Sequence, residues 1–475
     1  MTGLRKFLLP LGFNTRYIYH PYEQIQSENT ESIETILVSD RPMFKGVERS
    51  VPSSSLSRIY NFAKLGGSIM TGALYSKVSS GFNSSWKESL LSEENIEKLT
   101  EGLLKMRGAA LKLGQFISFQ DSKKLPPSLV KAMERTRREA YIMPAAQLER
   151  VLREELGEDW EKKFDEFEMM PFAAASIGQV HVARYQGKKV AVKIQYPGIE
   201  QSIDSDLNNL YRLFQWTNIL PRGLFADALV ENSREDLVNE CNYLLEAENQ
   251  IRFAELLKND KNFFVPKIFK EVSTKHVMTS EFLESLIFED ICAKVNQETR
   301  DKIGTRIMRL TVREIFEFKF MQTDPNPANF QYDMKNDQVQ LLDFGASRGY
   351  SNEFVMKYRQ AVDAGIRKDR EKVLEMIKVL RFVIGDEHED CIRGHVNSIL
   401  AVGEPFSAPG IYDFGSQSIT PQVYKQLPMM MQHRKVPPPP ETYTIHRKLS
   451  GAFLLCMKLR AKVPARAIYE EFIAF

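Results

Sequence analysis

The sequence predicts an α+β fold in which a small, mixed sheet region is followed by a larger and mostly helical region. Short runs rich in β-branched residues occur in 167–283, around VHVARY, KKVAVKIQY and KHVMTSEFL, and a long helical pattern interrupts them. Helical patterns dominate again in 284–475. The exceptions there are NFQYD and VQLLDFG, which the turn-forming MKND would join as a hairpin.

The composition describes a globular protein with no global preference for polyanions. Of the 475 residues, 43% are hydrophobic and 27% are charged, which is enough to bury a large core in more than one compact unit. The 64 Lys and Arg nearly balance the 62 Asp and Glu, so the net charge of +2 predicts no nucleic-acid binding. The four cysteines lie far apart, which favours a reducing compartment over a disulfide framework or a zinc site.

The N-terminal region predicts two segments: 1–58 as a transit-like or disordered N-terminus, and 59–166 as a helical extension. The start of the chain is basic and has no acidic residue before Glu23, which is typical of a mitochondrial transit segment or of an ordinary basic terminus. No stretch reaches the roughly 18–20 apolar residues of a membrane-spanning helix. A helix that begins near Ile59 is expected to pack on protein, with a membrane surface as the alternative.

Three motifs follow one another in the order that a nucleotide-phosphate site requires. VAVK ends in Lys193, whose ammonium on a strand could hold the α- and β-phosphates of a nucleotide. TDPNPANF supplies Asp324 and, five residues later, Asn329, and LLDFG supplies Asp343. The predicted hairpin would bring Asn329 and Asp343 together as oxygen ligands for magnesium. A strand lysine or an Asp-Pro turn is ordinary alone, but the ordered set favours a two-lobed protein kinase-like fold.

The lobes are expected at 167–283, with a helical insertion, and at 284–475. Where a protein kinase has a Gly-rich loop over the phosphates, AAASIGQV is Ala-rich, which restricts the backbone and would change the pose or the selectivity of the nucleotide. The strand in HVMTSEFLES is expected to contribute the adenine side. The predicted nucleotide-binding residues are Ala173, Ala174, Ala175, Ser176, Gly178, Val180, Lys193, Met278, Glu281, Phe282 and Leu283.

Two features of protein kinases are absent from the sequence. Gln322 and Thr323 precede Asp324, so there is no His-Arg-Asp, and no Ala-Pro-Glu follows Asp343. Phosphorylation of proteins in trans is therefore not expected.

Taken together, the motifs resemble the UbiB-type atypical kinase family, and in particular its eukaryotic mitochondrial branch that supports coenzyme Q biosynthesis. The resemblance covers about residues 47–475 and includes VPSSSLSR, LKLGQFISFQD, the Ala-rich loop, VAVKIQYPGI, ECNYLLEAEN, TDPNPANF, LLDFG and TYTIHRKLSGAFLLC. It implies a helical N-terminal Lys-x-Gly-Gln extension, a mostly helical C-lobe, ATP and Mg²⁺ as cofactors, and ATP hydrolysis that membranes stimulate.

The resemblance also assigns regulatory and ion-pair residues. Lys112 and Gln115 carry the Lys-x-Gly-Gln motif, whose helix in the family lies over the active site and is thought to occlude a peptide-substrate groove. The family's Glu-x-Asp ends here in Asn242, which removes a carboxylate and puts a direct metal role there in doubt. Glu240 is predicted to pair with the strand lysine, and Glu246 is the alternative.

The family's HADPHPGN is altered as well, with Gln322 and Asn326 in place of the two histidines. Asp324 and Asn329 of this motif are retained. The residues expected to carry the phosphate chemistry are therefore present.

The predicted function is that of an atypical kinase-like ATPase supporting coenzyme Q biosynthesis. Lys193 would hold phosphates, Asn329 and Asp343 would hold magnesium, and Asp324 would orient a nucleophile for in-line attack on the γ-phosphate. The expected partners are coenzyme Q precursor lipids or biosynthetic enzymes, an anionic membrane contacted peripherally, and a second copy in a homodimer. The expected location is the matrix face of the mitochondrial inner membrane. A small-molecule kinase acting on a lipid precursor and a non-catalytic ATP-binding scaffold remain as alternatives.

Overall fold

The computed structural model describes residues 47–48, 64, 66–68, 70–72, 74–75, 77–78, 95 and 141–473, apart from 176, 218–224, 417–418, 420–429, 431–432 and 438. Most of the predicted N-terminus and helical extension lies outside the described residues. The described positions from 64 to 78 are helical, as the pattern that begins near Ile59 predicts.

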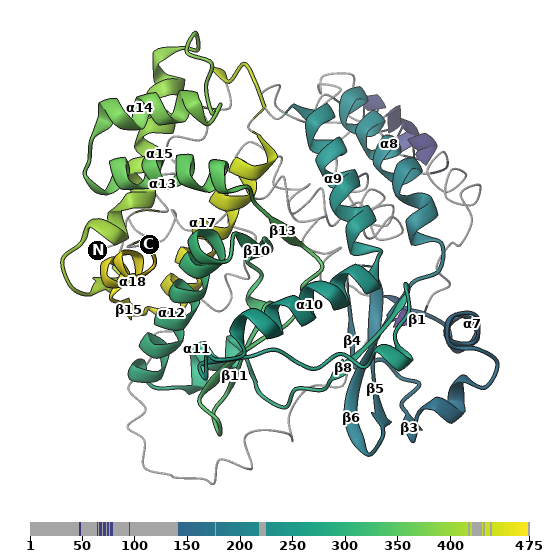
Figure 1. Cartoon of the computed structure of the whole chain (residues 1–475). Helices are drawn as coiled ribbons and strands as arrows, with labels where there is room; N and C mark the ends of the chain where they lie inside the picture. Colours follow the sequence, from purple (N-terminus) through teal and green to yellow (C-terminus); the bar gives the residue numbers. More distant parts are fainter. Residues whose placement is uncertain are drawn as a thin grey trace. The chain divides into compact units, whose positions relative to one another are not determined.

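The chain divides into two compact units, and it passes between them more than once (Figure 1). The first unit comprises Met1–Pro221, Ala226–Cys241 and Thr274–Val277. The second comprises Arg222–Phe225, Asn242–Ser273 and Met278–Phe475. The α+β class is confirmed, because the first unit is built on a sheet and the second is mostly helical.

The sheet of the first unit forms around a long hairpin. β5 (Gly178–Tyr185) and β6 (Lys188–Gln195) pair antiparallel along their whole lengths. Both residues of the turn have positive φ, 51° at Gln186 and 72° at Gly187, which is the geometry of a two-residue hairpin turn and explains the glycine. β3 (Glu166–Phe167) and β4 (Ala173–Ala174) both pair antiparallel with β5.

Helices complete the first unit. α7 (Ala145–Leu156) precedes a 3₁₀ turn, η2 (Trp160–Lys163), and its buried residues recur at helical spacing. α8 (Ile199–Thr217) and α9 (Ala226–Glu240) pack on each other. The two-residue strands β1 (Val47–Glu48) and β2 (Tyr141–Ile142) pair in parallel. β8 (Val277–Glu281) is the strand in which the chain leaves this unit.

The second unit contains a four-stranded sheet in the order β7-β12-β11-β9. Its centre is the predicted hairpin, in which β11 (Phe330–Asp333) pairs antiparallel with β12 (Gln338–Leu341). The short strands β7 (Phe263–Phe264) and β9 (Leu286–Ile287) flank them. A separate antiparallel pair joins β10 (Phe320–Gln322) to β13 (Ser347–Gly349).

Among the described residues, the helices of the second unit are α10 (Tyr243–Leu257), α11 (Phe288–Lys294), α12 (Gln297–Val312), α13 (Asn352–Ile366), α14 (Arg370–Val379), α15 (Glu389–Ser407), α17 (Pro440–Leu459) and α18 (Ala465–Ile473). Side-chain N-caps explain where several begin: Asn242, Asn296, Ser351 and Asp369 each accept a bond from a backbone N–H three residues on. α12 continues into a π-helical turn, η5 (Arg313–Glu317), and a 3₁₀ turn, η6 (Pro327–Asn329), precedes β11. The two-residue strands β14 (Tyr412–Asp413) and β15 (Lys462–Val463) pair antiparallel.

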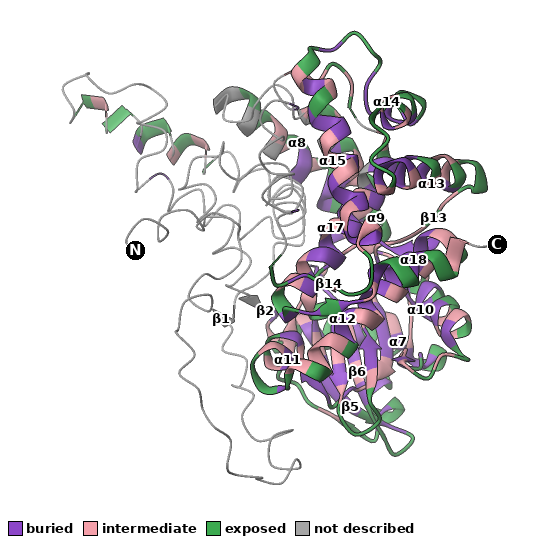
Figure 2. Ribbon diagram, turned by 90° about the vertical axis from the view of Figure 1, so that its left-hand side faces the viewer, coloured by how far each residue is buried: buried purple, intermediate pink, exposed green. Residues whose placement is uncertain are grey.

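The core of the second unit lies among α12, α13, α15 and α17, whose buried turns are purple in Figure 2. α13 and α15 approach closely because both have glycine at the crossing. A Cβ on Gly403 would lie 2.6 Å from the carbonyl carbon of Gly365. Within the described part of the chain, no helix has the length and apolar character needed to cross a membrane.

Candidate active site

The Ala-rich loop is a hairpin between β4 and β5. Ala173 pairs with Val180 and Ala174 pairs with Gln179, and the N–H of Ala175 donates to the carbonyl of Gly178 at 2.8 Å. The three alanines are half-buried. Because the strands pair up to the tip, the alanine methyl groups are accommodated in extended backbone, and no positive φ is required of them. Ser176 lies outside the described residues.

A buried chain of polar contacts, which was not predicted from the sequence, supports this hairpin. The N–H of Met143 donates to Gln179 Oε1 at 3.0 Å, and Gln179 Nε2 lies 2.8 Å from His181 Nε2. His181 Nδ1 lies 2.8 Å from the carbonyl of Glu168. All of these hydrogen bonds can form when His181 is neutral: Nδ1 carries the proton and donates to the Glu168 carbonyl, and Nε2 accepts from the Gln179 amide. Burial lowers the pKa of His181 to about 4, which favours that neutral form.

Lys193 lies on β6 directly opposite Val180 of the hairpin. Val192 and Ile194, its neighbours on the strand, are fully buried. Because side chains alternate along a strand, Lys193 projects from the opposite face and is half-buried. Glu240, predicted to pair with Lys193, is the last residue of α9 in the same unit.

In the second unit, the segment from β10 to η6 brings Asp324 and Asn329 together. The side-chain amide Nδ2 of Asn329 donates to the backbone carbonyl of Asp324 at 3.3 Å. Asn329 is buried, whereas Asp324 is half-buried. Asn326, where the family has histidine, accepts a bond from the N–H of Ala328 and thereby caps η6.

Asp343 lies beside Asn329, as the hairpin predicts. The N–H of Leu342 donates to the carbonyl of Asn329 at 2.9 Å, which places the two motifs at the same end of β11 and β12. Asp343 has a left-handed backbone, with φ of 57°, and its carboxylate accepts a bond from the N–H of Gly345 at 3.2 Å. Gln322 Nε2 donates to the carbonyl of Asp343 at 3.2 Å. Asp343 is exposed. Hydrogen bonds nevertheless hold its own carbonyl and the N–H of Leu342 just before it.

α10 packs against the Asp-Phe-Gly segment from the other side. Phe344 is 1% exposed, and its ring lies 5.0 Å from that of Phe253. Asn249 Nδ2 donates to the carbonyl of Phe344 at 3.2 Å. Glu246 is buried, and a Cβ on Gly345 would lie 3.4 Å from its carboxylate. Of the two candidate glutamates, Glu246 therefore belongs to the group around Asp343, and Glu240 lies in the other unit.

Asn242 has a structural role that explains why an amide suffices at this position. Its side-chain oxygen accepts a bond from the N–H of Leu245 at 3.3 Å and so caps the first turn of α10. Asparagine and aspartate serve equally well as N-caps. The family's carboxylate is therefore not needed to begin the helix that carries Glu246.

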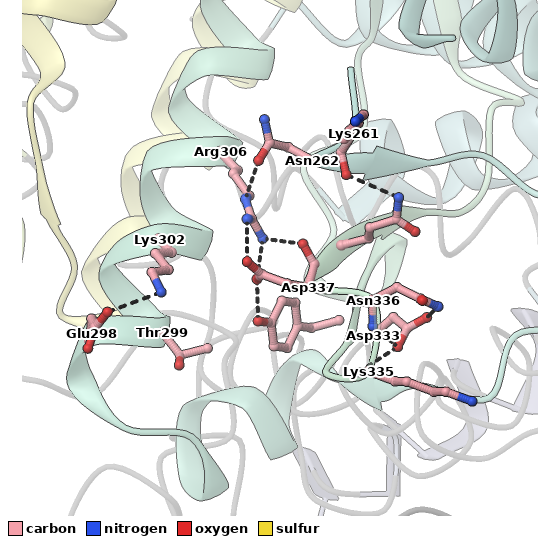
Figure 3. Close-up of polar contacts among 12 residues, drawn as sticks. Lys261, Asn262, Glu298, Thr299, Lys302, Arg306, Asp333, Lys335, Asn336 and Asp337 are labelled. Atoms are coloured by element: carbon pink, nitrogen blue, oxygen red, sulfur yellow. Dashed lines mark hydrogen bonds and ion pairs between the residues drawn. The ribbon is translucent and has the colours of Figure 1, made fainter. Parts of the chain in front are cut away.

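The far end of the β11–β12 hairpin is anchored to α12 (Figure 3). The Arg306 guanidinium contacts both carboxylate oxygens of Asp337, at 2.8 and 2.9 Å. It also donates to Asn262, and the Tyr332 hydroxyl donates to Asp337 at 2.6 Å. The Arg306 guanidinium beside it holds the pKa of Asp337 at about 2. The turn that joins the two predicted metal ligands is thus fixed at its tip.

The remaining predicted residues lie on or just after β8, or outside the described residues. On β8, Met278 is 5% exposed, and the N–H of Glu281 donates to the carbonyl of Lys267 at 2.9 Å. That N–H is therefore already bonded within the second unit. Phe282 is half-buried and Leu283 is buried. Lys112 and Gln115 lie outside the described residues.

The residues that hold Gln322 and Thr323 were not predicted from the sequence. Arg447 and Lys448, on α17, and Glu314, in the π turn after α12, are buried charged residues that contact this segment directly or through one another. The signal was a pair of cations inside the apolar helix pattern of TYTIHRKLSGAFLLC. Buried charges are usually paired, so two adjacent cations in such a helix point to partners elsewhere in the fold.

The chain is similar in sequence to known proteins. Residues 135–377 match the model of the ABC1 atypical kinase-like domain. The chain is 42% identical over 432 residues to the Saccharomyces cerevisiae protein named atypical kinase COQ8, mitochondrial, covering 90% of this chain and 86% of the relative. It is 43% identical over 451 residues to the Schizosaccharomyces pombe protein of the same name, covering 94% of this chain and 72% of the relative.

A solved structure extends the comparison to the fold. The complex of Rv3197 with erythromycin from Mycobacterium tuberculosis matches with a TM-score of 0.55 and 26% identity, covering 70% of this chain and 83% of that chain. The resemblance to UbiB-type atypical kinases is thereby confirmed, and the chain belongs to the ABC1 atypical kinase-like family.

Proposed function

We propose that this protein is an ATP-dependent atypical kinase or ATPase that supports coenzyme Q biosynthesis at the matrix face of the mitochondrial inner membrane. The observation that carries the proposal is the convergence of Asp324, Asn329 and Asp343 in one unit, through the bonds that tie Asn329 to both aspartate segments. Family membership implies ATP binding, and relatives are named mitochondrial.

The residues present fit a magnesium site of the kind that nucleotide substrates complete. Magnesium is usually held by one or two protein oxygens, with waters and phosphate oxygens completing the octahedron. Among the described residues there is no group of three or more His, Cys, Asp and Glu that could hold a metal alone. One carboxylate, from Asp343, and one amide oxygen, from Asn329, match the smaller requirement. With its nitrogen on the Asp324 carbonyl, Asn329 has its oxygen available as a ligand.

In the proposed mechanism, each of the predicted site residues has a separate task. Lys193 holds the α- and β-phosphates, and the Ala-rich hairpin covers them with a backbone that its strand pairing keeps rigid. Asp324 orients the nucleophile, water or the hydroxyl of a lipid precursor, in line with the γ-phosphate. Magnesium, when bound, neutralises charge on the phosphates. Glu240 is proposed to pair with Lys193, with Glu246 as the alternative, and the Lys-x-Gly-Gln residues Lys112 and Gln115 to regulate access.

The proposal also includes contact with an anionic membrane, a homodimer, and coupling of turnover to coenzyme Q precursor lipids or biosynthetic enzymes. These parts rest on the family resemblance. They predict that phosphate release increases when membranes or the acceptor are supplied.

The test is magnesium-dependent phosphate release by the purified full-length protein, without and with anionic liposomes. Asp343→Asn is compared with Asp386→Asn, an isosteric change at an exposed aspartate of the same unit. Loss of a metal ligand is expected to lower release by at least about 100-fold, and the control should match wild type.

Three results would be informative. Release that liposomes raise and Asp343→Asn abolishes supports the ATPase. A phosphorylated lipid precursor, detected by mass spectrometry, would identify a small-molecule kinase at the same site. ATP binding with equal, background release from wild type, Asp343→Asn and Asp386→Asn would refute the catalytic proposal and leave a scaffold.

A further inference from the structure

The short segment from Gln322 to Pro325, which contains Asp324, is held by one helix far away in the sequence. Arg447, on α17, is 5% exposed and reaches the residue just before Asp324. Its Nε donates to the carbonyl of Thr323 at 2.9 Å, and its Nη2 donates to the Thr323 hydroxyl at 3.1 Å. The same hydroxyl donates to the carbonyl of Ala346 at 2.8 Å, after the Asp-Phe-Gly. One guanidinium thus ties both chain segments together.

The next residue of α17 acts on the same segment through an ion pair. Lys448 Nζ lies 2.5 Å from Glu314, and the side chains are 3% and 1% exposed. The other carboxylate oxygen of Glu314 accepts a bond from the N–H of Gln322 at 3.1 Å. Gln322 in turn donates its side-chain amide to the carbonyl of Asp343. A continuous path of polar contacts therefore leads from α17 to the residue predicted to bind the metal.

A third position of α17 contacts the residue just after Asp324. Gly451 has no side chain, and Pro325 occupies the space that a side chain would need. A Cβ on Gly451 would overlap the Pro325 ring and lie 3.4 Å from its Cα. The segment is therefore fixed on both sides of Asp324, by polar contacts before it and by close packing after it.

The same face of α17 makes one more such contact. The hydroxyl groups of Thr444 and Tyr350 are 2.6 Å apart, and Tyr350 follows the strand after the Asp-Phe-Gly. Thr444, Arg447 or Lys448, and Gly451 are spaced at three or four residues, so they form one stripe.

The buried charge of Lys448 and the glycine at 451 are unfavourable in a helix that only fills a core. A buried ion pair is often no better than apolar residues of the same volume, because both charges lose their hydration. Glycine in the middle of a helix lowers its stability. The buried ion pair and the glycine therefore require an explanation other than filling a core, and their contacts with Gln322–Pro325 supply one.

We propose that Arg447 and Lys448, with Gly451, are positioning residues that hold Gln322–Pro325 in the geometry that places Asp324 and Asp343 for phosphoryl transfer. The inference rests on the proposed function, which assigns those two aspartates their tasks. Because α17 acts through backbone position, it affects the transition state, where sub-ångström placement matters, more than it affects nucleotide binding.

The test compares three variants of the full-length protein. Arg447→Lys keeps the charge but cannot donate to both oxygens of Thr323 from a planar fork. Gly451→Ala introduces the overlap with Pro325. Both leave the Glu314–Lys448 ion pair in place, so the chain retains its buried charge balance. Arg460→Lys, at the exposed C-terminal end of the same helix, is the matched control.

Two readouts separate positioning from stability: kcat and KM for ATP from phosphate release at saturating Mg²⁺, and amide hydrogen exchange over residues 320–330. For Arg447→Lys and Gly451→Ala we expect kcat to fall by about 10- to 100-fold, with KM within about threefold of wild type. Exchange over 320–330 should accelerate, and Arg460→Lys should match wild type in both readouts.

The outcomes also distinguish this inference from the proposed function. If wild type is active and both variants keep its kcat and its exchange rates, α17 is a packing helix and the inference is wrong. If wild type releases no phosphate, the hydrolytic function fails, and the exchange rates alone then decide whether α17 holds the segment. Faster exchange over 320–330 would support the positioning role, and unchanged exchange would overturn it.

Discussion

His181 makes the stability of the first unit depend on pH in a direction that the structure determines. The side chain is fully buried on β5, between the amide of Gln179 and the carbonyl of Glu168. Protonation would turn Nε2 from an acceptor into a donor. Gln179 would then have to turn its oxygen towards the ring and present its amide hydrogens to the N–H of Met143. No arrangement of the charged form satisfies all of these groups.

The direction of this pH dependence follows from the pKa of His181 in the folded protein and its pKa in the unfolded chain. The pKa of His181 is about 4 in the folded protein, because burial disfavours the charged ring, and 6.5 is its ordinary value. The unfolded chain therefore binds a proton first as the pH falls. The stability due to this group is complete above pH 6.5 and is lost as the pH falls towards 4. The difference between the two pKa values corresponds to about 3 kcal/mol.

The perturbation is His181→Asn, which removes the titrating ring and keeps an amide that can donate to Glu168. Urea unfolding is measured between pH 7 and pH 4 and followed through Trp160. That ring is edge-on to Phe167 at 5.2 Å, and Phe167 stacks on His181 at 5.4 Å. Phenylalanine at the other two tryptophans makes Trp160 the sole reporter.

Wild type should lose about 3 kcal/mol more than His181→Asn over this pH range. The control is Val182→Ala, a destabilising change at a buried residue next on the strand, which should lower stability at every pH without changing the pH dependence. Equal pH dependence of wild type and His181→Asn would refute the assignment of a neutral, buried His181.

Two further predictions concern the second unit. Gly403→Ala would place a Cβ 2.6 Å from the backbone of Gly365, so urea unfolding should show a loss of about 1–3 kcal/mol; wild-type stability would mean that α13 and α15 can separate at this crossing. Asp337→Asn removes the carboxylate that Arg306 holds at the hairpin tip, and because that side chain is 51% exposed the cost near pH 7 should be less than about 1 kcal/mol. Since the pKa of Asp337 is about 2 and its ordinary value is 3.8, this contribution should be present above pH 3.8 and vanish as the pH falls through 2. An equal cost of Asp337→Asn at pH 2 would contradict the ion-pair explanation. Faster amide hydrogen exchange in this variant elsewhere than in the β11–β12 turn would contradict it as well.

The strands and motifs could be predicted because their signals are local. β6 alternates between buried and half-buried residues from Val190 to Ile194, as a strand with one covered face should. The hairpin that joins Asn329 to Asp343 is indicated by a turn between two β-type runs. The offset of five residues between Asp324 and Asn329 predicted that both belong to the phosphate site, and the 3₁₀ turn Pro327–Asn329 ends at the second of them. The placement of these residues at one end of β11 and β12 follows from antiparallel pairing alone.

The supporting contacts could not be predicted, because their partners are far apart in the sequence. Arg447 and Thr323 are separated by 124 positions, and Asn249 and the carbonyl of Phe344 by 95. A cation in an apolar helix pattern indicates that it has a partner in the fold. Which residue is that partner depends on how the helices pack, and the periodicity of the sequence does not specify this. The π turn that carries Glu314 has no sequence signal either, since its residues continue the pattern of α12.

Gln322 shows how a change at a family position can preserve the geometry of the site. The position of the family's histidine is used here to donate a hydrogen bond to the carbonyl of Asp343, and an amide makes that bond without titrating. The replacement of histidine by glutamine is unfavourable in one respect, because the Gln322 side-chain oxygen is buried without a hydrogen-bond partner among the described groups. The backbone N–H of the same residue bonds to Glu314, which Lys448 holds. Because the backbone of Gln322 is held in place, its side chain can differ from the family's histidine, provided that it still donates to the carbonyl of Asp343. This position therefore requires a hydrogen-bond donor and does not require a titrating ring.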